Sequence, residues 1–254
     1  MLGLVLISGC KPHLGKSATS RQADRIIGAA ADYLQNGKEA KAIAAFRKAS
    51  DLDSRNFNTQ QKIVENLVVE GKCKEAIPFI RRAIDLPPDG RDKRDLFEDK
   101  RRDSAMYTIL GDCYNKPHMI EQAEESYGQA VKLDNTNATA YNDWAYMYAD
   151  LGIKKRDALR LAKKAEYLDP ESPEIIDTVG WAYYQLGRYR EAREALEKAV
   201  KLEPNSAEIR YHLGCACEEL GDHAAALVEY HKAIALFPDY KEAKNSLKKF
   251  SKNP

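Results

Sequence analysis

The sequence has no excess of charge of either sign and no long run of apolar residues. Its 254 residues include 40 lysines and arginines and 39 aspartates and glutamates, so its formal net charge is +1. Such a balance offers no field that would steer the chain onto nucleic acid, and we expect no nucleic-acid partner. An apolar run of about 18 residues or more, which a membrane-spanning helix needs, is also missing.

Cysteine and histidine do not occur in patterns that predict a metal site. The five cysteines lack the spacing of a disulfide framework. Cys215 and Cys217 are two residues apart, and on a helix such side chains point about 200° apart. We therefore expect Cys73, Cys113, Cys215 and Cys217 to be small buried or half-buried residues. The histidines show no H-E-x-x-H pairing, and we expect them to be solvated: His13, His118, His212, His223 and His231.

One segment comes close to a catalytic motif, the phosphate-binding loop G-x-x-x-x-G-K-[ST]. Five residues instead of four separate Gly9 from Gly15, which precedes Lys16 and Ser17. Such a loop also needs a parallel sheet around it, whereas everything after residue 22 has helical spacing. The sequence therefore predicts a non-enzymatic protein with no cofactor, no metal and no small-molecule substrate. A nucleotide hydrolase stays open as an alternative.

An alanine recurs along the chain with a nearly constant period of 34 residues. Successive members are 34, 47, 35, 34 and 34 residues apart, so one 13-residue insertion accounts for the longest gap. A second alanine follows seven residues after each of them, which places both on one face of a helix that packs closely against a neighbour. The pairs are Ala42 and Ala49, Ala76 and Ala83, Ala123 and Ala130, Ala158 and Ala165, Ala192 and Ala199, and Ala226 and Ala233.

Other residues repeat in phase with the alanines. Twelve residues earlier, a small residue such as Gly111 or Gly180 stands where two helices would cross. About nine residues earlier, a large residue such as Tyr33, Tyr148 or Tyr183 is expected in the core. Five of the six turns between the helices carry a glycine, where a left-handed residue ends a helix at little steric cost. These glycines are Gly37, Gly71, Gly152, Gly187 and Gly221.

This 34-residue pattern resembles the tetratricopeptide repeat, a helix-turn-helix unit. The resemblance implies an all-α fold, a right-handed α-solenoid of six repeats, because each unit buries its apolar face by stacking on the next. We expect the solenoid at 23–251, with a basic capping helix at 241–251. The repeats are expected at 23–56, 57–90, 104–137, 138–172, 173–206 and 207–240, with an insertion at 91–103.

The insertion is charged at eleven of its thirteen positions, with both signs mixed. We expect a solvated helix extension or loop, in which ion pairs contribute at most ~0.5 kcal/mol each. Because insertions in repeats often lie on one functional face, a partner-docking flap that carries Leu96 and Phe97 stays open.

The N-terminus carries a second resemblance. An apolar run at 2–7 leads into Ile7-Ser8-Gly9-Cys10, which resembles a bacterial lipobox. The resemblance implies a signal peptide at 1–9 that is removed, a lipid anchor on Cys10, and a flexible leader at 10–22. No lysine or arginine precedes the run, so we expect Met1 to lie inside a longer signal.

The residue after that cysteine is Lys11, which by the same resemblance favours the periplasmic face of the outer membrane. The alternative is a cytoplasmic scaffold in which residues 1–10 are a disordered or packed segment.

The tetratricopeptide resemblance also implies a binding groove, because the first helix of each repeat lines the concave face. In repeats four to six this face is aromatic, and aromatic side chains carry much of the energy at protein interfaces. The alternative is that Tyr146 or Trp181 only packs between adjacent repeats. The predicted groove residues are Asn142, Asp143, Tyr146, Asp177, Trp181, Tyr184, Tyr211, His212 and Cys215.

The first three repeats offer a weaker and more acidic strip on the same face. A clamp for a C-terminal carboxylate is not reproduced there, since Ile27 and Ala31 occupy the corresponding places, and we expect no chaperone-tail receptor. We expect an envelope lipoprotein adaptor that binds an extended segment of a partner during assembly of a secretion, pilus or exopolysaccharide machine. The strip residues are Asp24, Gln61, Lys62, Glu65 and Asp112.

Overall fold

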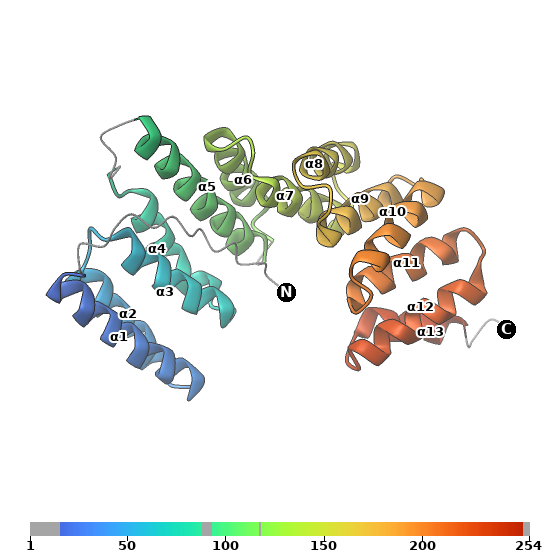
Figure 1. The fold of residues 1–254 in the computed structure, drawn as a ribbon. Helices are drawn as coiled ribbons and strands as arrows, with labels where there is room; N and C mark the ends of the chain where they lie inside the picture. The colour runs from blue at the N-terminus through green and yellow to red at the C-terminus, as the bar shows by residue number, and fades with distance from the viewer. Residues whose placement is uncertain (1–15, 88–92, 117, 251–254) are drawn as a thin grey trace. The chain divides into compact units, whose positions relative to one another are not determined.

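The computed structural model describes residues 16–87, 93–116 and 118–250, and every regular element in these ranges is an α-helix. The predicted all-α class is therefore confirmed (Figure 1). The helices are α1 (Ala18–Gln35), α2 (Glu39–Leu52), α3 (Phe57–Val69), α4 (Cys73–Ile84), α5 (Lys93–Asn115), α6 (Ile120–Leu133), α7 (Ala138–Asp150), α8 (Lys155–Leu168), α9 (Pro173–Gln185), α10 (Tyr189–Leu202), α11 (Ala207–Glu219), α12 (His223–Leu236) and α13 (Lys241–Phe250).

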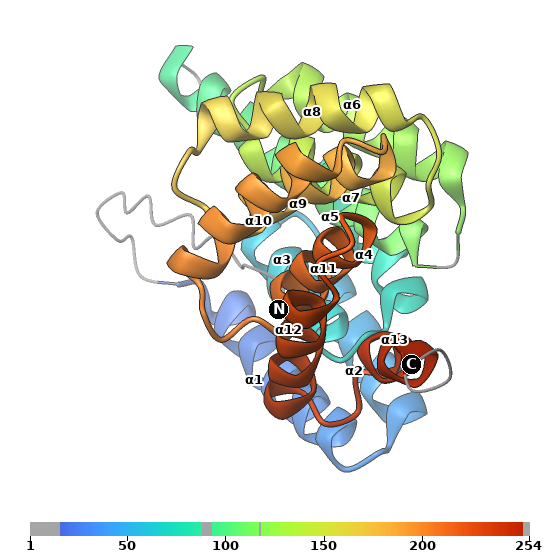
Figure 2. The same ribbon diagram turned by 90° about the vertical axis from the view of Figure 1, so that its right-hand side faces the viewer.

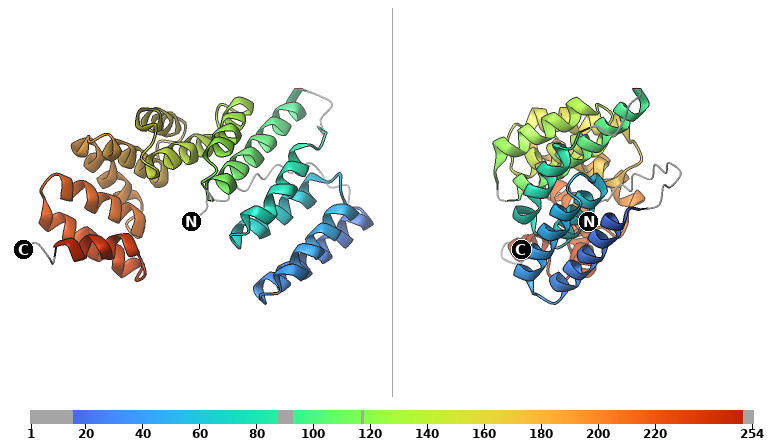
Figure 3. Two further views of the ribbon diagram at one scale, coloured as in Figure 1. Left: turned by 180° about the vertical axis from the view of Figure 1, so that it is seen from behind. Right: turned by 90° about the vertical axis from the view of Figure 1, so that its left-hand side faces the viewer.

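The chain divides into two compact units, Met1–Pro88 and Asp89–Pro254, which we call unit 1 and unit 2. The division falls where the charged insertion interrupts the 34-residue period. Unit 1 holds the helix pairs α1/α2 and α3/α4, which Figure 3 shows in blue and cyan. Unit 2 holds α5 to α13, and Figure 2 shows its last helices, α11 to α13, in front.

Each pair consists of an odd-numbered helix, here called an A helix, and the even-numbered B helix that follows it. All twelve alanines of the periodic pattern lie on B helices and are fully buried. The A helix crosses its B helix at the predicted glycine. A Cβ atom added to Gly180 would lie only 2.6 Å from Cγ of Leu196. A Cβ atom added to Gly111 would lie 2.5 Å from the ring of Tyr127. The close helix crossings predicted at these glycines are confirmed.

The turns between A and B helices repeat one geometry. The five predicted glycines have φ between 65° and 78°, as a left-handed helix end requires. In the third pair, which lacks the glycine, His118 takes this conformation with φ of 58°. Its backbone N–H bonds Asn115 O at 2.8 Å, so the turn closes although the residue is not glycine.

Two expectations about local structure need correction, those for the leader and for two core tyrosines. Residues 18–22, predicted to belong to a flexible leader, are helical, because Ser17 caps α1 by accepting the N–H of Ser20 at 2.9 Å and the helix starts at Ala18. The insertion, expected as a helix extension or a loop, is helical from Lys93 and extends the A helix α5 at its N-terminus. Tyr33, which was expected in the core, is 36% exposed, and Tyr183, also expected there, is half-buried. Tyr148 is buried as predicted.

Within unit 2, successive A helices adjoin. Helix α7 contacts both α5 and α9, and α9 contacts α11, so residues from different repeats meet on one surface. Helix α13 packs against α12 at the end of the unit, with Ala243 fully buried. This arrangement positions the candidate site described next.

Candidate partner-binding surface

Three rings stack across the fifth and sixth helix pairs. Trp181 and Tyr184 of α9 have ring centroids 4.6 Å apart at an interplanar angle of 7°. His212 of α11 also stacks on Trp181, with centroids 4.2 Å apart at 14°. Trp181 and His212 are buried, and Tyr184 is half-buried. Stacking of this kind fixes the register between α9 and α11.

Asp177 of α9 holds the imidazole of His212 in place. The Nδ1 atom of His212 lies 2.9 Å and 3.0 Å from the two carboxylate oxygens of Asp177, and both side chains are buried. Burial lowers the pKa of His212, but the carboxylates of Asp177, Glu208 and Asp150 outweigh it and raise the pKa. The pair is thus a buried ion pair between neighbouring repeats when the histidine is protonated.

A second contact joins repeats that are not neighbours. The phenol of Tyr146 on α7 donates a hydrogen bond to Oε1 of Glu208 on α11, 62 residues later in the chain. Burial and the nearby carboxylates of Glu208 and Asp150 raise the pKa of Tyr146, so its phenol stays a proton donor. In a solenoid each repeat normally contacts only its neighbours, and this contact spans a whole repeat.

Two exposed carboxylates, Asp150 and Glu208, lie near His212, and Glu242 lies near Asp150. Burial raises the pKa of Asp150 at the end of α7, and Glu208 and Glu242 raise it further, whereas His212 and His118 lower it. Asp150, Glu208 and Glu242 are all exposed. Within the described part of the chain, none of these three carboxylates forms an ion pair with a lysine or arginine.

Two further tyrosines extend the surface toward the C-terminus. The ring centroid of Tyr211 lies 5.2 Å from that of Tyr240 and 5.8 Å from that of His212. Both tyrosines are half-buried, so each keeps part of its ring exposed. We call the accessible residues together the acidic tyrosine surface: Tyr146, Asp150, Tyr184, Glu208, Tyr211, Tyr240 and Glu242.

Asn142 and Asp143, which were predicted in the groove, belong to a different cluster on α5, α6 and α7. Asn142 donates to Asp143 Oδ1 at 3.3 Å, and Tyr127 donates to Asp112 Oδ1 at 2.7 Å. Burial raises the pKa of Asp112 to about 6, and burial with the Asp112 carboxylate raises that of Asp143 well above its ordinary value. Both carboxyl side chains are half-buried, and burial is the largest cause of both pKa shifts.

The structure thus brings several predicted groove residues together on α7, α9 and α11, and it places Asn142 and Asp143 in a separate cluster. Tyr146, Tyr184 and Tyr211 stay accessible, whereas Trp181 is only 9% exposed and His212 3%. The expectation that every histidine is solvated is wrong for His212. Cys215 is also buried, with Tyr230 Oη 3.6 Å from its sulfur, while the four described cysteines are free and buried as predicted.

Sequence reasoning missed the acidic members of the surface. Asp150 and Glu208 occupy repeat positions 13 and 2, which the tetratricopeptide resemblance already assigns to the concave face. Attention to charge as well as to aromatic rings at those positions would have found them. Tyr240 is the last residue of the sixth repeat and Glu242 lies in the capping helix beyond it, and neither occupies a repeat position assigned to the concave face.

The A helices of unit 1 carry a different surface. Asp24 of α1 forms ion pairs with Lys16, at 2.5 Å, and with Lys62 of α3. Those hydrogen bonds lower the pKa of Asp24. Gln61 donates to Glu65 at 2.8 Å. The polar groups of this strip therefore satisfy one another.

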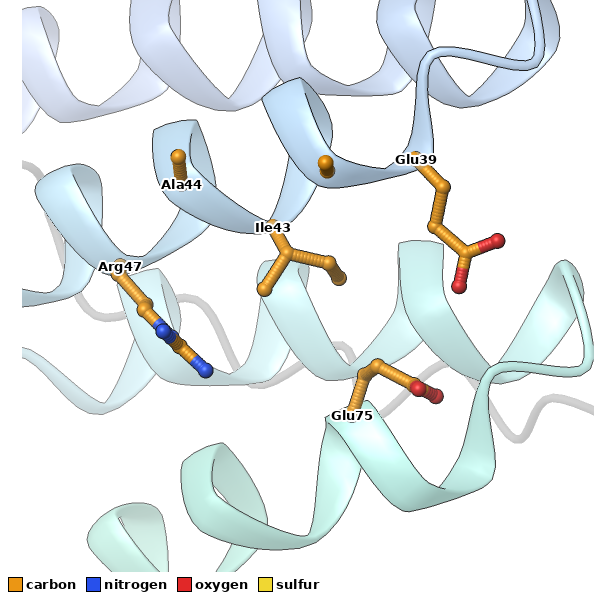
Figure 4. Close-up of a pocket in the computed structure, with 6 residues that line it drawn as sticks. Glu39, Ile43, Ala44, Arg47 and Glu75 are labelled. Atoms are coloured by element: carbon orange, nitrogen blue, oxygen red, sulfur yellow. The ribbon is translucent and has the colours of Figure 1, made fainter.

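A shallow depression in unit 1 lies on its B helices instead. Glu39, Ile43 and Arg47 of α2 and Glu75 of α4 line it (Figure 4). Lys72 pairs with Glu39 at 2.5 Å, so one of its carboxylates is already neutralised. The depression brings together no set of groups with a defined chemistry.

Several sequence expectations concern residues outside this surface. Cys10 and the lipobox lie outside the described residues. Of the near phosphate-binding loop, Ser17 caps α1 and Lys16 pairs with Asp24. In the described ranges, no helix is long and apolar enough to cross a membrane, and no three His, Cys, Asp or Glu side chains are grouped to hold a metal.

Comparison with known protein families identifies the repeat unit that the helix pairs form. Tetratricopeptide-repeat family profiles match residues 180–241 in unit 2 and residues 33–56 in unit 1. The chain therefore contains tetratricopeptide repeats, and its described helix pairs have the all-α tetratricopeptide-repeat fold.

Its relatives share the fold at low sequence identity. The TPR repeat-containing protein YpiA of Bacillus subtilis is 24% identical over 211 residues, which cover 74% of this chain and 50% of YpiA. A chain of the Cut9–Hcn1 hetero-tetramer of the APC/C superposes with a TM-score of 0.69 at 19% identity, covering 89% of this chain and 42% of that one. TTC0263, a tetratricopeptide-repeat protein of Thermus thermophilus, gives a TM-score of 0.59 at 20% identity, covering 75% of this chain and 96% of that one.

This chain thus spans half or less of the length of YpiA and of the matched Cut9–Hcn1 chain. At these identities the solved structures establish the fold alone.

Proposed function

We propose that this chain is a non-enzymatic scaffold that binds an extended segment of a partner protein on the acidic tyrosine surface of unit 2. The observation that carries the proposal is the set of half-buried rings on adjoining A helices: Tyr184 of α9 and Tyr211 of α11 rest on the buried Trp181 and His212. Tyrosine combines a large apolar area with a polar tip and little conformational entropy, which suits it to interfaces.

The buried side chains of Trp181 and His212, which lie beneath the tyrosine rings, support the proposed binding surface. Because stacking and the Asp177–His212 contact hold Trp181 and His212 in place, the rings above them are pre-ordered. A pre-ordered surface loses less conformational entropy when a partner binds. Scaffold function needs no reacting group, and the surface combines only aromatic rings and carboxylates.

Loss of the two accessible rings tests the proposal. We expect Tyr184→Ala/Tyr211→Ala to weaken capture of the natural partner from a cell extract by about 2 kcal/mol or more. The matched control is Tyr167→Ala on the B helix α8, whose side chain is 80% exposed and lies outside the surface. Equal recovery of partner by the double variant and by the control would refute the proposed surface.

The cellular setting is a separate part of the proposal. The lipobox-like Ile7-Ser8-Gly9-Cys10 supports an envelope lipoprotein adaptor, anchored through Cys10 and acting in assembly of a secretion, pilus or exopolysaccharide machine. A cytoplasmic scaffold without lipid is the alternative. The intact mass of the chain expressed in a bacterium decides: loss of residues 1–9 with acyl addition supports the anchor, and an unmodified Met1 contradicts it.

A further inference from the structure

We infer that the segment bound on the acidic tyrosine surface is cationic, an extended polypeptide stretch that carries several arginines or lysines. This inference rests on the proposed scaffold function and adds the chemistry of the partner. It follows from three features of the surface: carboxylates without cations, accessible rings, and a buried donor without an acceptor.

The carboxylates come from three different helices. Asp150 ends α7, Glu208 begins α11, and Glu242 lies in α13. Glu208 and Glu242 are close enough to Asp150 to raise its pKa, so the three like charges repel one another. A chain with several positive charges would remove this repulsion, whereas an acidic segment, a phosphate or a nucleic acid would increase it.

The three carboxylates of this surface differ from several others in unit 2, which have a lysine or arginine partner. On other faces of unit 2, some carboxylates pair with nearby cations: Glu124 with Lys154 at 2.5 Å, Glu191 with Arg188 at 2.7 Å and Glu229 with Arg210 at 2.7 Å. In the described part of the chain, no lysine or arginine forms an ion pair with Asp150, Glu208 or Glu242, and Glu208 accepts a hydrogen bond from Tyr146. The neighbouring imidazoles, His212 and His118, are the groups that partly offset the negative charge of Asp150.

The rings favour a cation over a neutral apolar segment. Tyr184, Tyr211 and Tyr240 are half-buried, so part of each ring is exposed, and Glu208 and Glu242 are close enough to Tyr240 to raise its pKa. A guanidinium or ammonium group is attracted to the face of such a ring, and arginine also stacks on it. The chain uses this contact elsewhere, where Arg188 lies 4.6 Å from the ring centroid of Tyr183.

The indole N–H of Trp181 is the independent third feature. It is buried and has no hydrogen-bond acceptor within the described part of the chain, although buried donors are nearly always paired. An extended polypeptide segment has backbone carbonyl groups, and one of them could accept a hydrogen bond from this indole N–H. Because Tyr184 stacks on the indole, we expect its ring to shift on binding, and tryptophan fluorescence should report the shift.

A single metal ion is a poorer occupant than a polypeptide. The described residues hold no group of three His, Cys, Asp or Glu side chains that could ligate one ion. Carboxylates on α7, α11 and α13 instead match several charges along an extended chain, which a polypeptide segment rich in arginine or lysine can supply.

The test uses the full chain and a short fluorescein-labelled peptide of alternating arginine and glycine, followed by fluorescence anisotropy. We expect Asp150→Asn/Glu208→Gln/Glu242→Gln to weaken binding of this peptide by about tenfold or more. The control Glu121→Gln/Glu125→Gln/Glu194→Gln removes the same number of charges from exposed positions on the B helices α6 and α10, and we expect less than about twofold loss. Circular dichroism establishes that both variants are folded.

A glutamate-glycine peptide of the same length should bind at least about tenfold more weakly than the arginine peptide. Equal losses in the two triple variants, equal binding of the two peptides, or no binding of the arginine peptide would each overturn the inference. If capture of the natural partner still depends on Tyr184 and Tyr211 in that case, the scaffold function stands and only the cationic chemistry is wrong.

Discussion

The A helices of unit 1 and unit 2 have the same backbone design but opposite electrostatics. In unit 1, hydrogen bonds from Lys16 and Lys62 lower the pKa of Asp24. In unit 2, burial and the neighbouring Glu208 raise the pKa of Asp150. One carboxylate has its cations within the fold, and the other does not. The comparison indicates that unit 2 carries the surface that lacks its counter-charges.

The layers beneath the two surfaces differ as well. Unit 1 has ion pairs on its A-helix surface, whereas unit 2 has a buried stack in which Trp181 lies against both Tyr184 and His212. A repeat frame therefore leaves the A-helix surface free to vary, because the frame depends on the buried alanines of the B helices and on the glycines at the crossings.

The largest expected difference in the free energy of unfolding concerns the buried pair of Asp177 and His212. His212→Ala leaves Asp177 buried without its partner, and we expect a loss of about 3–5 kcal/mol in the free energy of unfolding. The corresponding change in unit 1 is Lys62→Ala, which breaks a half-exposed pair and should cost at most ~1 kcal/mol. Urea unfolding followed by circular dichroism measures both. Similar losses of unfolding free energy in the two variants would contradict the expected difference between a buried pair in unit 2 and a half-exposed pair in unit 1.

A second pair of variants should act with opposite signs. Asp112 has a folded pKa of about 6, above the ordinary value of ~4, so the folded state holds this proton more tightly than the unfolded chain. Its stabilisation is present below about pH 4 and is lost as the pH rises through about 6. Asp112→Asn, which keeps an acceptor for Tyr127, should therefore stabilise the protein by ~1–3 kcal/mol at pH 8 and little at pH 4.

The control for that experiment is Asp24→Asn in unit 1. The pKa of Asp24 is lowered by Lys16 and Lys62, so its stabilisation is present at neutral pH and is lost as the pH falls through the lowered value. Removing this charge should slightly destabilise the protein at pH 8. The same sign for both variants at that pH would contradict the contrast between the units.

A third pair of variants concerns two helix-A glycines. Gly180→Ala in unit 2 places a Cβ 2.6 Å from Leu196 and should cost ~1–3 kcal/mol. Gly28→Ala in unit 1 meets no atom within 4 Å and should stabilise by roughly 0.5–1 kcal/mol, because alanine favours the helix. Thermal midpoints of the two variants should thus move in opposite directions.

Much of the frame could be predicted from the sequence because its determinants are local and repeat. The alanines of α10 and the glycine at position 180 each fulfil a requirement that recurs every 34 residues, and the structure buries or crowds each of them as expected. The left-handed His118 could not be predicted, since its turn lacks the glycine that marks the others.

The candidate site was less predictable because it depends on contacts between repeats. The repeat position of Trp181 indicates the concave face, but only the presence of His212 on α11 and Tyr184 on α9 decides that its ring is covered. Tyr183, expected in the core, instead packs beside Arg188 and Lys163. The hydrogen bond from Tyr146 to Glu208 joins residues two repeats apart, and no nearest-neighbour pattern contains it.

The measurement that tests the central claim most directly is site-specific photo-crosslinking in cells. A photoreactive phenylalanine analogue replaces Tyr184 or Tyr211 in unit 2, and Tyr33 of the A helix α1 in unit 1 serves as the matched position, with 36% of its surface exposed. If the acidic tyrosine surface binds the partner, adducts with one partner protein form from positions 184 and 211 and not from position 33. Adducts from position 33 alone, or equally from all three, would contradict the account.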